Sequence, residues 1–243
     1  QEQLVSIDVV EEKKGGHFII HNPNDQTVEV LDVRPALRHL LLMVRGEVQK
    51  GVHKDLRRFL CGHDERHWFV AAIPEDARVS TVTQAMEALK PKAVQGAQEK
   101  AGVKAKHRTK RKTAGYVRQG EWFFIPRKRM KIPELLVLQN EPLRRGNGKP
   151  HMAQFLYRKG GKTVYVCGQH PNGLTEKAYQ KLLAENAQTR HFGWRIMQRD
   201  PDVFVKGRIT HPDHATVVLD VWHRVSQNTE ARAVAFRDVA FLD

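Results

Sequence analysis

The first thirty residues of the chain follow the pattern of apolar and polar positions that is typical of strands. Residues Leu4–Val10 alternate with a period of two, and turn residues separate this segment from His17–His21 and from Thr27–Leu31. Strands joined by short turns are usually antiparallel neighbours. The pattern therefore predicts an antiparallel meander of three strands at the start of the chain.

Helical spacing of apolar residues predicts a second kind of element. Asp32 is a candidate cap for a short, largely buried helix over Ala36–Val44. Val79–Leu89 has apolar residues three and four positions apart, Pro91 suits the first turn of a following helix, and Leu174–Asn186 is a further helical segment. We therefore expect four or five helices in all.

Short apolar runs bounded by turn residues predict further strands. These runs are Phe59–Gly62, Trp68–Ile73, Trp122–Ile125, Ile132–Leu138, Asp202–Ile209, Thr216–Val225 and Ala231–Phe241. Two more runs, Gln154–Arg158 and Lys162–Cys167, flank a Lys-Gly-Gly turn. We expect these last two segments to pair as a hairpin.

Together the elements predict an α+β fold with mainly antiparallel strands, four or five helices and a basic central segment. The chain has 243 residues, which suits one large domain or two small ones. We expect an N-terminal α+β part over residues 1–103, a basic connecting segment over 104–118 and a strand-rich part over 119–243. One continuous domain is the alternative.

Positive charge is concentrated between Lys100 and Lys131. This stretch contains twelve Lys and Arg and one acid, Glu121, so its net charge is +11 (twelve minus one), against +14 for the whole chain. In its middle lies the apolar strand Trp122–Ile125. A dense basic block beside a folded core favours a polyanionic partner, above all nucleic acid.

We expect the basic residues to bind phosphates of nucleic acid, with RNA slightly favoured over DNA. The candidates are Lys104, Lys106, Arg108, Lys110, Arg111, Lys112, Arg127, Lys128, Arg129, Arg144 and Arg145. Aromatic residues of the neighbouring strand and Tyr116 would offer stacking surfaces if exposed. One alternative is that the protein is a structural component of a nucleoprotein assembly. Another is that the basic residues are a solvated charge run beside a buried strand and bind no partner.

Histidines at strand ends and turns suggest a second alternative, a phosphodiester enzyme or nuclease. The candidate catalytic residues are His63, His67, His211, His214 and His223. Paired imidazoles can act as general base and acid on a phosphodiester, and the same side chains with nearby carboxylates can hold a divalent metal. Neither spacing is diagnostic, and ordinary turn or surface histidines have the same pattern.

The two cysteines each precede a glycine and a nearby histidine. Cys61 with His63 and Cys167 with His170 would together make a Cys2His2 structural zinc site. Buried free thiols are the alternative interpretation. Two cysteines are too few for a disulfide framework, which favours a reducing, cytoplasmic location.

Several function classes lose support from the sequence. The longest apolar run is far too short to cross a membrane, and the N-terminus lacks the pattern of a secretory signal. The chain contains no Walker A, dinucleotide-binding or serine-hydrolase motif. It also lacks the motifs of common RNA-binding modules, so the basic block alone carries the prediction of nucleic-acid binding.

Overall fold

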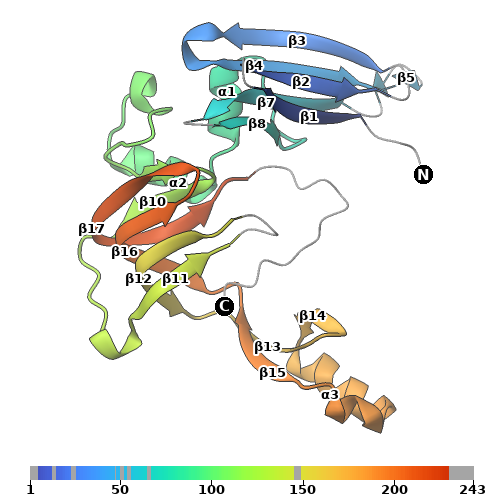
Figure 1. Ribbon diagram of the computed structural model, residues 1–243, viewed down its shortest axis with the longest axis vertical. Helices are drawn as coiled ribbons and strands as arrows, with labels where there is room; N and C mark the ends of the chain where they lie inside the picture. Colours follow the sequence, from blue (N-terminus) through green and yellow to red (C-terminus); the bar gives the residue numbers. More distant parts are fainter. Residues whose placement is uncertain are drawn as a thin grey trace. The chain divides into compact units, whose positions relative to one another are not determined.

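Figure 1 shows the chain as a computed structural model. The structure describes residues 5–12, 15–22, 26–46, 48–49, 52–53, 56–64, 67–144 and 149–229. These residues fall into two compact units, the first made of residues up to 125 together with 226–229, and the second made of residues 126–225. Each unit is described by itself.

The fold is mostly β, and the expectation of an α+β fold with four or five helices is wrong. In the described part of the chain there are seventeen strands and three α-helices: α1 (Val82–Ala88), α2 (Lys92–Lys100) and α3 (Glu176–Glu185). All three lie where helical spacing predicts them. The fourth expected helix, Ala36–Val44, is instead a strand.

The segment expected to form this fourth helix lies between two other strands of a sheet in the first unit. A short 3-10 turn, η1 (Pro35–Leu37), ends at Arg38 with a left-handed backbone (φ 55°). The apolar run that follows forms β4 (His39–Arg45), which pairs with β3 (Thr27–Arg34) on one side and β7 (Leu56–Asp64) on the other. A strand buried in the middle of a sheet is apolar throughout, so periodicity cannot distinguish it from a short buried helix.

The first unit is organised around a four-stranded antiparallel sheet with the order β3-β4-β7-β8, in which β8 spans His67–Ala72. Leu41 and Leu60 of this sheet form a core with Val82 and Ala85 of α1. Thr81 is the N-cap of α1 and forms a reciprocal capping box with Gln84. The helix therefore covers one face of the sheet.

The remaining strands of the first unit form small pairs. Strands β1 (Ser6–Glu12) and β2 (Gly15–His21) pair with each other, whereas β3 belongs to the four-stranded sheet, so the predicted three-stranded meander is wrong. Two two-residue strands also pair, namely β5 (Val48–Gln49) and β6 (Val52–His53).

Helix α2 shares a second core of this unit with a strand pair. Strand β9 (Val117–Gln119) pairs with β10 (Trp122–Pro126), and Phe123 and Ile125 of β10 pack with Val94 of α2 and with Tyr116. The segment between α2 and β9 carries the densest positive charge and includes one 3-10 turn, η2 (Ala105–His107).

The second unit contains two groups of antiparallel strands. In the first group, β11 (Leu138–Leu143), β12 (His151–Lys159), β16 (Asp202–His211) and β17 (His214–Gln227) lie side by side in that order. In the second group, β13 (Lys162–Cys167) lies between β14 (His170–Leu174) and β15 (Arg195–Arg199), next to α3. A 3-10 turn, η4 (Ala187–His191), connects α3 to β15.

The predicted hairpin of Gln154–Arg158 with Lys162–Cys167 is also wrong. Strand β12 pairs with β11 and β16, while β13 pairs with β14 and β15. Gly160 and Gly161 both have positive φ (70° and 98°) and lead the chain from one group of strands to the other. Turn residues predict that the chain bends, but they do not identify the partner of the next strand.

Two further strand predictions have mixed outcomes. Part of Ile132–Leu138 is a 3-10 turn, η3 (Glu134–Leu136), and the strand begins only at Leu138. The expected strand Ala231–Phe241 lies outside the described residues. Within the described residues, no helix has the length and apolar character needed to cross a bilayer.

Candidate functional site

The basic segment between α2 and β9 is attached to the core through one backbone carbonyl. The carbonyl oxygen of Arg108 accepts hydrogen bonds from Lys90 Nζ at 2.7 Å and from Gln98 Nε2 at 2.9 Å. The hydroxyl of Tyr116 lies 2.7 Å from the same oxygen and 2.9 Å from the carbonyl oxygen of Lys110. We call residues 101–114 the basic loop; its middle is tied to three buried side chains.

The three anchoring side chains are almost inaccessible to solvent. Lys90 is 4% exposed, Gln98 is 0% exposed and Tyr116 is 1% exposed. Burial lowers the pKa of the Lys90 ammonium, an effect that the ion pair with Glu87 opposes. Burial also raises the pKa of Tyr116 to about 12. Buried polar groups are tolerated when they are hydrogen-bonded, and here their partners are backbone atoms of the basic loop.

Gly115, the residue that follows the basic loop, lies very close to α2. A Cβ atom at Gly115 would come within 2.9 Å of the Cα and N atoms of Gln98. Only glycine allows the two backbones to approach to this distance. This approach places Tyr116 beneath the loop.

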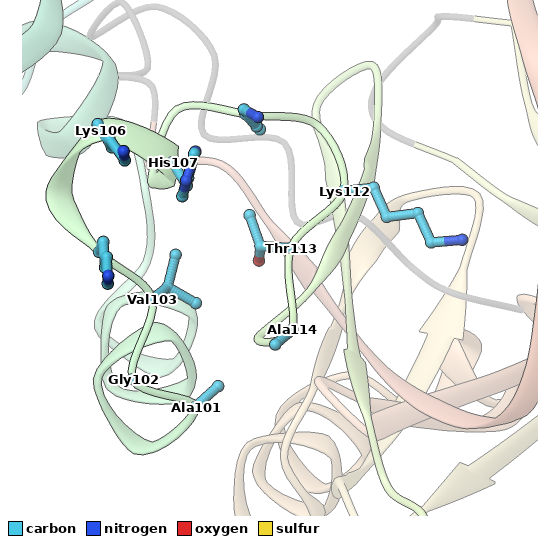
Figure 2. A pocket seen from close by; sticks show the side chains of 10 residues that line it. Ala101, Gly102, Val103, Lys106, His107, Lys112, Thr113 and Ala114 are labelled. Atoms are coloured by element: carbon cyan, nitrogen blue, oxygen red, sulfur yellow. The ribbon is translucent and has the colours of Figure 1, made fainter.

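The basic loop encloses a lysine-lined pocket with a volume of about 480 Å³. The pocket is lined by Ala101, Gly102, Val103, Lys104, Lys106, His107, Lys110, Lys112, Thr113 and Ala114. All ten residues are described, and none of them is acidic. In Figure 2, Lys106 and His107 lie on one side of the pocket, and Lys112 extends outward from the other side. The four lysines are exposed.

The arginines of the basic loop differ from its lysines because they contact the protein itself. Arg108 Nε donates to the carbonyl oxygen of Val103 at 3.3 Å. Arg111 forms an ion pair with Asp64, and Arg118 donates to the second oxygen of the same carboxylate at 3.2 Å. Part of the predicted phosphate-binding charge is therefore already balanced within the first unit.

The aromatic residues near the basic loop are buried on both faces of their strand. Trp122, Phe123 and Phe124 are 4%, 3% and 0% exposed, and Tyr116 is equally buried. Phe123 packs edge-on against Tyr116 with 5.2 Å between ring centroids. The expected stacking surfaces for bases are thus core residues: Phe123 packs in the core that includes Val94 of α2, and Trp122 and Phe124 on the other face are buried as well.

The other predicted phosphate ligands lie elsewhere. Arg127, Lys128 and Arg129 are exposed and follow β10 in the second unit, and Arg144 is exposed at the end of β11. Arg145 lies outside the described residues. The structure assigns none of these side chains to the lysine-lined pocket.

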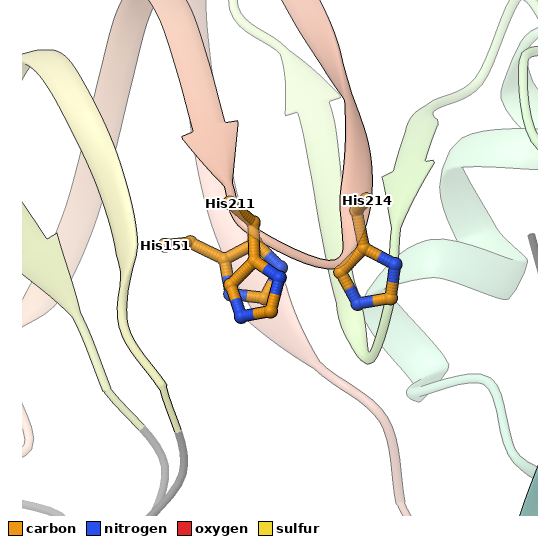
Figure 3. A group of neighbouring side chains, drawn as sticks. All are labelled: His151, His211 and His214. Carbon is orange, nitrogen blue, oxygen red and sulfur yellow. The ribbon is translucent and has the colours of Figure 1, made fainter. Parts of the chain in front are cut away.

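A second candidate site is a cluster of three histidines in the second unit. His151 begins β12, His211 ends β16 and His214 begins β17. Their rings are stacked, with centroid separations of 4.1 Å for His151–His211, 4.7 Å for His211–His214 and 5.3 Å for His151–His214. Figure 3 shows the three rings at one end of these strands. We call these residues the histidine cluster.

Strand register produces the histidine cluster. His211 and His214 are direct partners across the two-residue turn Pro212–Asp213. On the other side of β16, Thr210 pairs with Met152, which follows His151. Two of the predicted catalytic residues thus lie together, and His151, which was not among the predicted residues, lies beside them. Sixty residues separate His151 from His211, so no local pattern marks it.

Hydrogen bonds define the tautomer of His211. Its Nδ1 accepts a hydrogen bond from the backbone N–H of Asp213 at 3.1 Å. Nδ1 therefore carries a lone pair, and the proton lies on Nε2, which is 3.2 Å from the carbonyl oxygen of Lys149. Burial, together with the neighbouring His211 and His214, lowers the pKa of His151 to about 3.

The remaining predicted catalytic histidines have separate environments. His63 packs edge-on against Trp68 in the first unit, and the side chain of His67 is outside the described part of the chain. His223 is 7% exposed, and its Nδ1 is 2.7 Å from the carbonyl oxygen of Val221. Nine residues separate it from His214 along β17, a span of roughly 30 Å at about 3.3 Å per residue.

The predicted Cys2His2 zinc ligands are divided between the two units. Cys61 and His63 belong to the first unit, and Cys167 and His170 belong to the second. Both thiols are free and buried, and burial raises the pKa of Cys61 to about 12. His170 stacks on Trp194 with 5.6 Å between ring centroids. The four-ligand site stays a prediction.

Comparison with known proteins adds no relative: no family model, no curated protein and no solved structure matches this chain.

Proposed function

We propose that the protein binds nucleic acid by contacting backbone phosphates with the four lysines of the basic loop. The observation that supports this proposal is the lysine-lined pocket. Lys104, Lys106, Lys110 and Lys112 are exposed around one cavity, together with His107 and without an acidic lining residue. Clustered cations attract a polyanion because each phosphate contact releases condensed counterions.

The attachment of the basic loop supports binding rather than a solvated charge run. A flexible basic segment loses conformational entropy when it is ordered on a polyanion, and that loss weakens binding. Here Lys90, Gln98 and Tyr116 hold the middle of the loop before any partner arrives. The lysines are therefore presented from a preformed backbone.

The different contacts of the lysines and the arginines determine how many phosphate contacts we expect, and therefore how strongly binding depends on salt. Arg108 and Arg111 are engaged with Val103 and Asp64, so we expect about four phosphate contacts from the basic loop. Four contacts give a slope of about −3.6 for log K against log salt, or roughly 10²-fold weaker binding between 50 and 200 mM salt. A loop with all six cations available would give a steeper slope.

The aromatic residues of β10 are buried, so they cannot stack on bases, and this argument for RNA over DNA is lost. An experiment must therefore distinguish the two nucleic acids. We keep RNA as the first candidate partner and test it against DNA directly. The two free buried cysteines also suit the proposed cytoplasmic location, where thiols stay reduced.

The test measures binding of labelled single-stranded and duplex RNA and DNA across a salt series. A variant with Lys104, Lys106, Lys110 and Lys112 changed to Ala removes four charges from the pocket. The matched control changes Lys159, Lys162, Lys177 and Lys181 to Ala, which are four exposed lysines of the second unit. Loss of binding in the pocket variant alone supports the proposal, while equal loss in both variants shows that total charge, not this site, attracts nucleic acid.

A phosphodiester enzyme is the second candidate function, favoured by the juxtaposition of His211 and His214. The same binding samples show whether the nucleic acid is cleaved. Cleavage that is lost in His214→Ala but retained in His223→Ala would place chemistry at the histidine cluster. Intact substrate in all samples would remove this candidate and leave the binding function.

A further inference from the structure

We propose that His151, His211 and His214 form a binding site for a transition-metal ion of the zinc class. This inference goes beyond nucleic-acid binding, since it concerns the second unit and uses no residue of the basic loop. It remains valid or fails independently of the proposed function.

The distances between ligand atoms suit a metal after small side-chain movements. One ring nitrogen of each histidine lies within 4.8 Å of those of the other two. Zinc–nitrogen bonds of roughly 2.0–2.1 Å in a tetrahedral site place ligand nitrogens about 3.3 Å apart. The nitrogens therefore need to approach by about 1.5 Å at most, which rotation of the stacked rings can supply.

The backbone already holds the three residues in fixed relative positions. His211 and His214 are paired across a tight turn, and β12 is hydrogen-bonded to β16 next to His151. Ligands from three adjacent strands of one sheet cannot separate without breaking strand pairing. Binding thus needs little backbone reorganisation, which favours affinity.

The hydrogen bonds of His211 match those of a histidine metal ligand. A histidine ligand must be neutral and usually donates its second N–H to a carbonyl or carboxylate. His211 has this arrangement, because its Nε2 faces the carbonyl oxygen of Lys149 and its Nδ1 carries the lone pair. A metal would replace the backbone N–H of Asp213 as the partner of Nδ1.

The ligand set indicates which ions would bind. Imidazole nitrogens suit Zn²⁺, Co²⁺, Ni²⁺ and Cu²⁺, whereas Mg²⁺ and Ca²⁺ prefer oxygen ligands. Three protein ligands leave a fourth tetrahedral position, as in catalytic rather than structural zinc sites. His211 and His214 are partly exposed, so solvent reaches the cluster from their side.

The proposal is tested by titrating the protein with metal ions, after bound metal has been removed with EDTA and the protein has been transferred to metal-free buffer. Zn²⁺ is added in competition with a chromophoric chelator, and Co²⁺ binding is followed by visible absorption. We expect one ion per chain, cobalt bands typical of low coordination number, and no competition by Mg²⁺. Absence of binding at micromolar Zn²⁺ would overturn the proposal.

Variants assign the ion to the cluster. His211→Ala and His214→Ala are expected to weaken Zn²⁺ binding by at least about 10- to 100-fold. The control His191→Ala changes an exposed histidine of η4 and should bind like the unchanged protein. Far-UV circular dichroism checks the fold of each variant, and because both ligands are partly exposed, the outcome does not depend on replacing buried His151. Equal affinity in all variants would refute the assignment.

Discussion

The basic loop and the histidine cluster are assembled in opposite ways. Four pocket lysines lie within nine consecutive residues, and their neighbours in sequence are their neighbours in space. The three histidines come from three strands, and the first two are 60 positions apart in the chain. The first region brings together like charges that repel, so buried side chains must hold its backbone. The second brings together three imidazole rings that strand pairing positions.

The largest effect is expected when nucleic-acid binding and Zn²⁺ binding are both measured in variants of each site. Changing Lys104, Lys106, Lys110 and Lys112 to Ala should reduce nucleic-acid affinity by about 10²-fold or more at low salt, because four phosphate contacts are lost. Zn²⁺ binding should be unchanged in this variant. His211→Ala should show the reverse pattern. If either variant impaired both properties, the two regions would not be independent.

Metal binding should stabilise the protein by a comparable amount. At a free Zn²⁺ concentration of 100 times the dissociation constant, the free energy of unfolding should rise by about 2.7 kcal/mol, provided that the unfolded chain does not bind the ion. Denaturant unfolding with and without Zn²⁺ measures this change. The increment should vanish in His214→Ala and persist in His191→Ala; persistence in both would indicate another site.

A smaller effect is expected at the attachment of the basic loop. Gln98→Ala removes a fully buried amide that donates to the carbonyl oxygen of Arg108, and should cost about 1–3 kcal/mol of stability. Amide exchange in the basic loop should accelerate. Gln180→Ala in α3, where the glutamine is exposed, serves as the control. Unchanged exchange in Gln98→Ala would show that this hydrogen bond does not order the loop.

The smallest effect concerns the hydroxyl of Tyr116 and has a defined pH dependence. Tyr116→Phe should cost about 1 kcal/mol at neutral pH, the usual value of one hydrogen bond. The folded-state pKa of about 12 lies above the ordinary value of 10.0, so the folded protein retains this proton more tightly. The advantage of tyrosine is therefore present below about pH 10 and lost as pH rises toward 12.

Unfolding of both proteins from pH 7 to pH 11 measures this difference. Because phenylalanine does not titrate, subtracting the two stability curves removes the contributions of lysines and other groups that are common to both. A difference that stayed constant over this range would contradict the assignment of a buried, hydrogen-bonded hydroxyl.

Helices and charge were predictable because their signals are local. Apolar spacing located α1, α2 and α3, and Thr175 is the N-cap of α3. The basic block was visible from composition alone. The roles of its members were not, since the ion pair of Arg111 depends on Asp64, which lies 47 positions earlier in the chain.

Errors arose where the identity of a strand's partner decided the structure. A helix was expected over Ala36–Val44 because a continuous apolar run fits either state, and pairing with both β3 and β7 makes His39–Arg45 a strand. The Lys-Gly-Gly turn was expected to close a hairpin, yet it connects two different groups of strands. Buried Trp122 and Phe123 show the same limit, because exposure depends on what packs against each face.

By itself, the sequence indicated the positions of α1, α2 and α3, several of the turns and the concentration of positive charge, because these properties depend on residues within a few positions of one another. Only the tertiary structure decided which lysines line a cavity, which arginines are occupied by Asp64 and that His151 joins His211 and His214. The physical reason is that strand pairing couples residues at any separation along the chain, and no local pattern records the register.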